Sequence, residues 1–237
     1  MFSTPVEVFR FCCVEKHRKC TLQNWSPKEE GFYVLSHIPT DGNYTLQLRT
    51  LLLRDNQLES LNLNLFAPFP NLTELNVSLN KLRHVAGHFS NASLASLLFA
   101  HNRVKRLSLC EWDVLQEVTE LSVAFNNLTR IPECLWMLPN VSSLYLQGNQ
   151  IAVFDEHQFY GMTNLEVINL AFNKLSSVTI DPAKLPASLL QLHLYRNCLC
   201  SLNVSDQQLR AMGNLMIYLN KMSANRFINE ESDCHRC

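Results

Sequence analysis

Apolar and polar positions repeat along most of this chain with a period of about two dozen residues. Each unit has apolar residues at its first, fourth, sixth and eleventh positions and an asparagine at its ninth. Because side chains alternate between the two faces of a strand, the apolar pair at positions four and six predicts a short strand with one buried face. The units begin at Leu48, Leu72, Leu94, Val118, Val141, Leu165, Leu189 and, weakly, Ile217. The asparagines are Asn56, Asn80, Asn102, Asn126, Asn149, Asn173, Asn197 and Asn225.

A unit of this length cannot bury its own apolar side chains, so successive units must stack. Their starts lie 24, 22, 24, 23, 24, 24 and 28 residues apart, a period typical of leucine-rich repeats. We therefore predict an α/β leucine-rich-repeat solenoid, or horseshoe, with a parallel β-sheet on the concave face and an irregular or 3₁₀ convex face. Residues 1–45 are expected to form a Cys-containing N-terminal cap, residues 46–227 about eight repeats, and residues 228–237 a C-terminal cap or its beginning.

Two internal columns of side chains should hold the units together. The asparagine amide carries donors and acceptors, so it can satisfy backbone groups at the turn that leaves each strand. A second column is expected under the convex side, because several units place an aromatic residue ten positions after the asparagine. These aromatic residues are Phe66, Trp112, Trp136 and Phe159.

Charge and motifs exclude several classes of function. The net charge is −1, with Lys and Arg spread along the chain, whereas a nucleic-acid partner would require a basic stripe. No apolar run approaches the roughly 18 residues that a membrane span needs. The sequence has no phosphate-binding glycine motif, no nucleophile elbow and no His-Glu-x-x-His, so neither an enzyme nor a cofactor is expected. His84 and His88 lack a third ligand, which favours a solvated pair over a metal site.

Nine cysteines are typical of a secreted protein of this size. Cys110 and Cys134 occupy the same position in adjacent units, so we predict a disulfide between them. Because nine is odd, at least one thiol must be free or bonded to another chain, which allows a disulfide-linked homo- or heterodimer. Residues 1–11 do not have the pattern of a signal peptide, since Glu7 and Arg10 interrupt the apolar stretch.

The remaining cysteines lie near the ends of the repeat array. Three of them should stabilise the N-terminal cap, namely Cys12, Cys13 and Cys20. Near the other end, Cys198 and Cys200 could pair with Cys234 or Cys237, and the connectivity stays open.

Acceptor sites for N-glycosylation are more numerous than chance predicts, which also supports an extracellular location. The Asn-x-Ser/Thr sites are Asn24, Asn43, Asn71, Asn76, Asn91, Asn127, Asn140 and Asn203. Asn76 is expected at the centre of a concave strand, where a glycan would obstruct docking over the second unit.

The register of the repeat also identifies the side chains that should point outward from the concave strands. A broad curved surface of this kind suits a protein ligand better than a small molecule. Tyr145, His193 and Tyr195 are expected to cluster, and tyrosines are frequent anchors at interfaces. The candidate contact residues are Leu52, Arg54, Leu98, Tyr145, Gln147, His193, Tyr195 and Lys221.

The chain resembles the secreted leucine-rich-repeat immune proteins of mosquitoes. The resemblance rests on the short lead-in from Phe11-Cys12-Cys13 to Cys20-Thr21-Leu22, on loosely spaced repeats such as 72–80, and on the cysteines after the last units. It implies a haemolymph protein that forms disulfide-linked assemblies and stabilises a complement-like thioester protein. The sequence departs from many members in that it does not include their long C-terminal coiled coil.

Two functions therefore compete. The first is a secreted, innate-immune-type binding protein with a complement-like partner. The alternative is a fragment of a Toll-like receptor ectodomain, for which a further cap and an apolar span beyond Cys237 would be expected.

Overall fold

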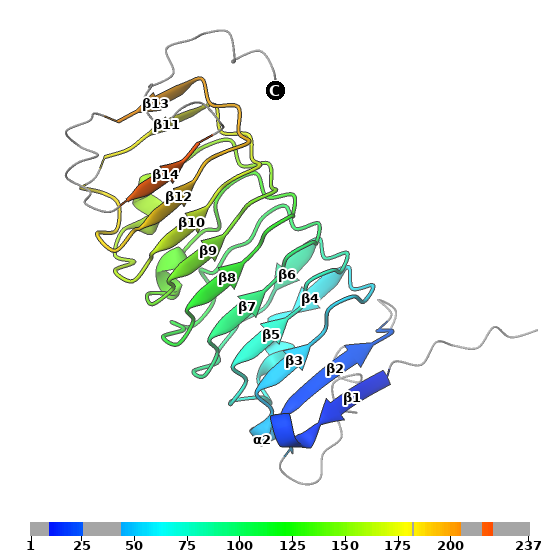
Figure 1. The fold of residues 1–237 in the computed structure, drawn as a ribbon. Helices are drawn as coiled ribbons and strands as arrows, with labels where there is room; N and C mark the ends of the chain where they lie inside the picture. Colours follow the sequence, from blue (N-terminus) through cyan, green and yellow to red (C-terminus); the bar gives the residue numbers. More distant parts are fainter. Residues whose placement is uncertain (1–9, 26–43, 182, 205–214, 220–237) are drawn as a thin grey trace, which may run out of the picture.

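The chain folds into a stack of coils, each of which adds one strand to a continuous sheet (Figure 1). The structure, a computed structural model, describes residues 10–25, 44–181, 183–204 and 215–219. The predicted leucine-rich-repeat solenoid is confirmed, with a parallel sheet along one side and few helices.

The main sheet has ten strands, and in those of the coils the central residue is an inward-facing leucine or isoleucine, fully buried except at Ile217. In order across the sheet they are β1 (Arg10–Val14), β2 (Lys19–Gln23), β3 (Thr50–Leu52), β5 (Glu74–Asn76), β7 (Ser96–Leu98), β8 (Glu120–Ser122), β9 (Ser143–Tyr145), β10 (Val167–Asn169), β12 (Gln191–His193) and β14 (Met216–Tyr218). All neighbours pair in parallel except β1 and β2, which form an antiparallel hairpin. The pair β2–β3 joins this hairpin to the first coil.

Short elements occupy the sides of the stack. Two further two-stranded parallel sheets pair β4 (Ser60–Asn62) with β6 (His84–Ala86) and β11 (Ser177–Thr179) with β13 (Ser201–Asn203). The helical elements are single turns: η1 (Glu15–His17), α2 (Tyr44–Gln47), η2 (Leu63–Phe66), η3 (Leu135–Met137) and η4 (Glu156–Phe159). The 3₁₀ turns on the side away from the sheet agree with the prediction from the repeat length.

The predicted asparagine column runs through the coils as a ladder of buried hydrogen bonds. In Asn126, Nδ2 donates to the carbonyl of Phe99 in the preceding coil at 2.9 Å, and Oδ1 accepts from the amide of Val104 at 3.0 Å. Its Nδ2 also donates to the carbonyl of Val123 in its own coil at 3.2 Å. Each asparagine therefore satisfies backbone groups of two coils, which fixes their register. The same arrangement is made by Asn56, Asn80, Asn102, Asn149, Asn173 and Asn197.

The residue immediately before each ladder asparagine has a left-handed backbone. Its φ lies between 52° and 71° in all seven coils, although only one of the seven residues is glycine. This conformation turns the chain at the end of the strand and points the side chain outward at the edge of the sheet. The residues are Asp55, Leu79, His101, Phe125, Gly148, Phe172 and Arg196.

A buried aromatic column under the convex side is present, but its membership differs from the prediction. Phe66, Trp112 and Phe159 are buried, and Phe89, which the predicted spacing of ten residues does not include, lies between the first two. Its ring makes edge contacts with Phe66 at 6.3 Å and with Trp112 at 5.5 Å between centroids. The prediction for Trp136 is wrong, because that side chain is 59% exposed.

The difference at Trp136 arises from a shift of one position. Phe89 and Leu135 both follow their ladder asparagine by nine residues rather than ten, and both are buried. In the coil of Asn126 the inward position is thus occupied by Leu135, and Trp136 points to solvent.

Disulfides cross-link both the hairpin and the coils. The Cys110–Cys134 bond that the repeat register predicts is present, with 5.1 Å between the Cα atoms. Cys13 and Cys20 pair across the β1–β2 hairpin, and Cys12 is free and exposed. Cys198 and Cys200 are also disulfide-bonded, while Cys234 and Cys237, their predicted partners, lie outside the described residues.

The predicted register of the last unit is wrong. Ile217 pairs with Leu192, the central leucine of β12, so it takes the fourth position of a unit and not the first. This places the unit 25 residues after the preceding one, in line with the other spacings. Asn225, the predicted ladder residue, lies outside the described residues. The division of the chain into caps and repeats remains a prediction.

Candidate protein-binding face

The solvent-facing side of the ten-stranded sheet, which we call the concave face, presents a column of side chains at the last residue of each strand from β3 to β14, continued by Thr21 on β2. Because the register is continuous from β2 to β14, each of these residues lies beside its equivalent on the next strand. The column is Thr21, Leu52, Asn76, Leu98, Ser122, Tyr145, Asn169, His193 and Tyr218.

The candidate contact residues with described positions lie on this face, but they do not form one cluster. Leu52 and Leu98 are half-buried at the ends of β3 and β7, and Arg54 is exposed just beyond β3. Tyr145 on β9 is two strands away from His193 on β12. Tyr145 therefore does not join the group that the sequence analysis expected.

Gln147 and Lys221 are two further candidate contact residues. The Oε1 atom of Gln147 is buried and has no hydrogen-bond partner among the described residues, and we have no physical account of it. Lys221 lies outside the described residues. In the corrected register, Tyr218 takes the place beside His193 in the column of outward side chains that was predicted for Lys221.

Four rings and one guanidinium group lie in contact at the C-terminal end of the concave face. We call these residues the aromatic cluster: Phe172, His193, Tyr195, Arg196 and Tyr218. The imidazole of His193 stacks on Tyr218, with 4.3 Å between centroids and 5° between planes. Tyr195 makes edge contacts with His193 at 6.1 Å and with Phe172 at 5.6 Å. The guanidinium of Arg196 lies 5.8 Å above the ring of Phe172.

The electrostatic state of the cluster follows from burial. The His193 side chain is half-buried between its neighbours, and this desolvation lowers its pKa below the ordinary value of 6.5. Its Nε2 atom lies 3.1 Å from Oε1 of Gln191 on the same strand. At neutral pH the ring is therefore uncharged, and Arg196 provides the positive charge of the cluster.

Three members of the cluster were missed from the sequence. Phe172 and Arg196 occupy the left-handed position before the ladder asparagine, and Tyr218 was hidden by the misassigned last unit. A usable signal existed for the first two, because the position before the asparagine contains large residues in most units. Without the backbone conformation, however, that position does not indicate an outward side chain.

The glycosylation candidates fall on several sides of the molecule. Asn24, Asn71 and Asn203 are exposed, and Asn127 and Asn140 are half-buried. Asn76 lies at the end of β5 on the concave face, as the register predicts. Asn43 lies outside the described residues.

One glycosylation candidate does not fit the fold. Asn91 is 4% exposed, and its Nδ2 donates to the carbonyl of Phe69 at 2.9 Å. The same nitrogen would have to carry the glycan, and the site has no room for one. The prediction for Asn91 is therefore wrong.

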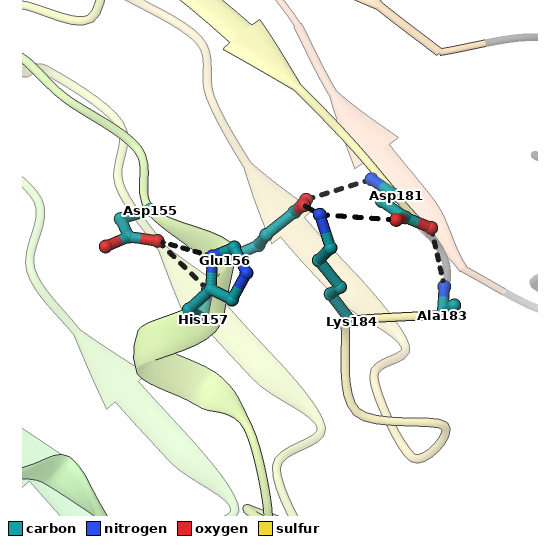
Figure 2. A network of polar contacts seen from close by, with 6 residues as sticks. All are labelled: Asp155, Glu156, His157, Asp181, Ala183 and Lys184. Atoms are coloured by element: carbon teal, nitrogen blue, oxygen red, sulfur yellow. Dashed lines mark hydrogen bonds and ion pairs between the residues drawn. The ribbon is translucent and has the colours of Figure 1, made fainter.

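A polar network on the opposite side of the stack fixes adjacent coils without forming a reactive site (Figure 2). The buried carboxylate of Glu156 accepts from the backbone amide of Asp181 at 2.9 Å and lies 3.4 Å from Nζ of Lys184. The same ammonium lies 3.4 Å from Asp181, and the hydrogen bonds to Glu156 and Asp181 raise the pKa of Lys184. Every carboxylate here has a cation or amide partner, which is the arrangement of a structural contact.

The described residues show neither a group of metal ligands nor a membrane-spanning helix. Within the described ranges, no group of three or more His, Cys, Asp or Glu side chains could hold a metal ion. None of the helices in the described part of the chain has the length and apolar character that a membrane crossing requires.

Comparisons with known proteins match this architecture. The family signature described as "Leucine rich repeat" matches residues 139–199. Keratocan of Gallus gallus is 31% identical over 64% of this chain and 43% of its own length, and podocan of Mus musculus is 29% identical over 75% and 25%. Lumican of Coturnix japonica is 26% identical over 71% and 48%. The matched segment thus spans less than half of the length of each of these relatives.

A solved structure shares the fold. The crystal structure of the LRIM1 leucine-rich repeat domain superposes with a TM-score of 0.52 at 16% identity, covering 90% of this chain and 77% of that one. The identity is low, so this likeness concerns the fold. Together with the asparagine ladder and the parallel sheet, the matches show that the chain has the leucine-rich-repeat fold.

Proposed function

We propose that this chain is an extracellular protein-binding module that holds a protein ligand on its concave face, with the aromatic cluster as the main contact. The observation that carries the proposal is the convergence of Phe172, His193, Tyr195 and Tyr218 on one end of a rigid sheet. Phe172 is 47% exposed and Tyr218 is 38% exposed, and because their rings belong to one contiguous group they offer a partner a connected aromatic surface. Aromatic and arginine side chains are the usual energetic centres of protein interfaces.

The shape of the surface favours a macromolecular ligand. The parallel strands from β2 to β14 form a broad sheet face, whereas small-molecule sites are concave cavities that enclose most of the ligand.

The disulfides support an extracellular location. Cys13–Cys20 and Cys110–Cys134 bonds persist in oxidising compartments and are rare in the cytosol. Exposed sequons at Asn24, Asn71 and Asn203 agree with passage through the secretory pathway.

The narrower proposal is a secreted innate-immune factor that binds or stabilises a complement-like thioester protein, in haemolymph or a similar fluid. It is supported by the resemblance of the cysteine-containing lead-in and repeats to the mosquito immune proteins. The exposed thiol of Cys12 provides a position for a disulfide-linked homo- or heterodimer. Both the partner and the assembly are part of this proposal.

Surface plasmon resonance against a purified mosquito thioester protein tests the narrower proposal. The test variant is Phe172→Ser/Tyr195→Ser, and the matched control is Tyr160→Ser, because Tyr160 is 76% exposed outside the concave face. We expect the test variant to weaken binding by about 30-fold or more, the effect of losing an interface centre, and the control to change it less than twofold. Equal weakening by both variants, or no binding by the unchanged chain, would exclude this partner.

A photo-crosslinking experiment tests the broader proposal without assuming the partner. Benzoylphenylalanine replaces Tyr195 in one protein and Tyr160 in the other, and both are exposed to haemolymph. A discrete adduct that forms only from position 195, and that an excess of unlabelled chain suppresses, is the expected result. Adducts from both positions alike would show that the concave face has no preferred ligand.

Export and covalent assembly are measured separately. The chain, supplied with a leader, is expressed in insect cells and compared on reducing and non-reducing gels, with and without deglycosylation. Glycosylated export and a dimer that Cys12→Ser abolishes are expected. Intracellular retention with all thiols reactive would refute the extracellular assignment.

A further inference from the structure

Cations that are far apart in the sequence meet on one lateral side of the second and third coils. Lys81 and Arg83 follow Asn80, and Arg103 and Lys105 follow Asn102 at the same two positions. Between them lie Leu82 and Val104, which are completely buried. Since side chains alternate along an extended segment, the four cations project on the outer side, and all four are exposed. We call these four residues the basic patch.

Backbone hydrogen bonds place the two pairs side by side. The amide of Arg103 donates to the carbonyl of Leu82 at 2.8 Å, which sets Arg103 between Lys81 and Arg83 on the neighbouring coil. Adjacent strands lie about 4.8 Å apart, and positions two residues apart on a strand about 6.6 Å. The backbone positions of the four cationic residues therefore form a small rectangle.

The patch is confined to these two coils. The equivalent positions are Gln57 and Glu59 in the coil before it and Asn127 and Thr129 in the coil after it. Although Lys and Arg are spread along the whole sequence, stacking therefore brings four of them together here. The net charge of −1 does not reveal the patch, because acidic residues elsewhere in the chain balance its four positive charges.

Glu59, at the equivalent position of the preceding coil, lies beside Arg83 but forms no ion pair with the basic patch. None of the four side chains of the patch forms an ion pair with a carboxylate of the described residues, although Arg106 beside the patch pairs with Glu133 at 3.6 Å. Like charges at this separation repel one another and weaken the fold slightly. An anionic ligand that bridges the two coils would remove this repulsion.

We infer that the basic patch binds a sulfated glycosaminoglycan. Its area suits the few closely spaced sulfates of a short saccharide segment, whereas nucleic-acid binding generally uses a longer basic stripe that neutralises many phosphates. A sulfated polysaccharide of the extracellular matrix is also a ligand that a protein at the proposed extracellular location would meet. The inference depends on the proposed function only for that location, because the patch and the aromatic cluster are different surfaces.

Heparin binding tests the inference. The four-fold variant Lys81→Gln/Arg83→Gln/Arg103→Gln/Lys105→Gln is compared with a charge-matched control, Arg10→Gln/Lys16→Gln/Arg49→Gln/Lys174→Gln, which removes four exposed cations elsewhere. Affinity for immobilised heparin is measured by surface plasmon resonance at several salt concentrations. We expect the patch variant to lose at least about tenfold in affinity and to show a shallower salt dependence, and the control to change by less than about threefold. Equal losses in both variants would indicate attraction to overall charge and overturn the inference.

Further probes separate the ligand classes. Desulfated heparin should fail to compete, and a DNA duplex of similar length should compete at least about tenfold more weakly than heparin. Competition by DNA as strong as by heparin would assign the patch to nucleic acid and refute the glycosaminoglycan. Because all four positions are exposed and their charges repel one another, the urea midpoint of the patch variant should equal or slightly exceed that of the unchanged chain, which shows that the fold is intact.

Two variants distinguish this inference from neighbouring effects. Asn127, a glycosylation candidate, lies in the coil next to Arg103, so Asn127→Gln tests whether a glycan there limits access; heparin affinity should stay equal or rise. Phe172→Ser/Tyr195→Ser should leave heparin affinity unchanged, so failure of the protein-binding proposal and failure of this inference are separate results.

Discussion

The ladder asparagines show how single residues determine the stacking of this protein. The side chain of Asn126 satisfies the buried carbonyl of Phe99 and the buried amide of Val104, both in the preceding coil. An aliphatic residue would fill the space but would leave these groups without partners. Because an unpaired buried polar group costs about 1–3 kcal/mol, each asparagine stabilises the interface between two coils.

Replacement of Asn126 by alanine should therefore be strongly destabilising. We expect the free energy of unfolding to fall by about 3 kcal/mol, since two buried backbone groups lose their partner. Urea denaturation followed by circular dichroism measures the change. The control is Asn64→Ala, at an exposed asparagine on η2, which should stay within about 0.5 kcal/mol of the unchanged chain. A similar small effect at Asn126 would show that the ladder is dispensable.

His193 gives the C-terminal coils a dependence on pH. Burial lowers its pKa in the folded chain, so between the ordinary value of 6.5 and the lower folded value the unfolded chain binds more protons. Stability contributed by the neutral ring is present above pH 6.5 and is lost as the pH falls through the folded pKa. His193→Phe, which keeps a ring against Tyr218, should reduce this loss.

Thermal unfolding of the two proteins between pH 7.5 and pH 5 checks this expectation. As the pH falls, the melting temperature of His193→Phe should rise relative to that of the unchanged chain. His17→Gln, at an exposed histidine, serves as the control and should follow the unchanged chain. A constant difference at all pH values would contradict the assignment.

At the scale of elements, the short strands and single turns depend on the columns of side chains between them. Strands of three residues and 3₁₀ turns of three or four residues are too short to be stable alone. The buried rings of Phe66, Phe89 and Trp112 pack edge to face across three coils and support the convex turns. Such pairs add about 0.5–1.5 kcal/mol to the burial of their area.

This packing predicts opposite outcomes for two aromatic residues. Phe89→Ala should reduce the free energy of unfolding by about 4 kcal/mol, because it leaves a cavity and removes two ring contacts. Trp136→Ala should change it by no more than about 0.5 kcal/mol, since the indole is largely exposed. Chemical denaturation of both variants measures the two values. Comparable losses would show that Trp136 is an internal residue after all.

The Cys110–Cys134 bond connects two coils at positions 24 residues apart. In the chain-entropy account, a loop of this length restricts the unfolded chain by about 3 kcal/mol. Cys110→Ser/Cys134→Ser should lower the free energy of unfolding by about that amount under non-reducing conditions. Cys12→Ser should leave it unchanged, because that thiol is free and exposed. A double variant as stable as the unchanged chain would show that the cross-link is not needed for stability.

At the scale of the whole molecule, each coil contacts mainly its neighbours, and stability is nearly a sum of coil and interface contributions. A local lesion should therefore spread to adjacent coils more than to distant ones. Hydrogen exchange of Asn126→Ala should accelerate in β8, β7 and β9, with much less change in β3 and β12. Uniform acceleration along the chain would indicate a single cooperative unit instead.

The local pattern was sufficient to predict the coils, the ladder asparagines and the Cys110–Cys134 bond. Each of these depends on residues that recur at a fixed spacing, and stacking converts equal spacing into contact. The same reasoning assigned Leu52, Leu98 and Tyr145 to the concave face. It was wrong where the spacing changes by a few residues: at Trp136 by one position, and at Ile217 by three.

The sequence by itself thus determined the architecture, because a unit that cannot bury its own leucines has to stack on the next one. Only the tertiary structure decided which surface residues meet. The left-handed turn before each ladder asparagine brings Phe172 and Arg196 to the edge of the sheet, and the stacking of two coils brings Arg83 beside Arg103. The physical reason is that buried positions must be apolar, so they recur in the sequence with the period of the coils. Outward positions have no such constraint, and which of them become neighbours depends on backbone geometry and on the register of the coils.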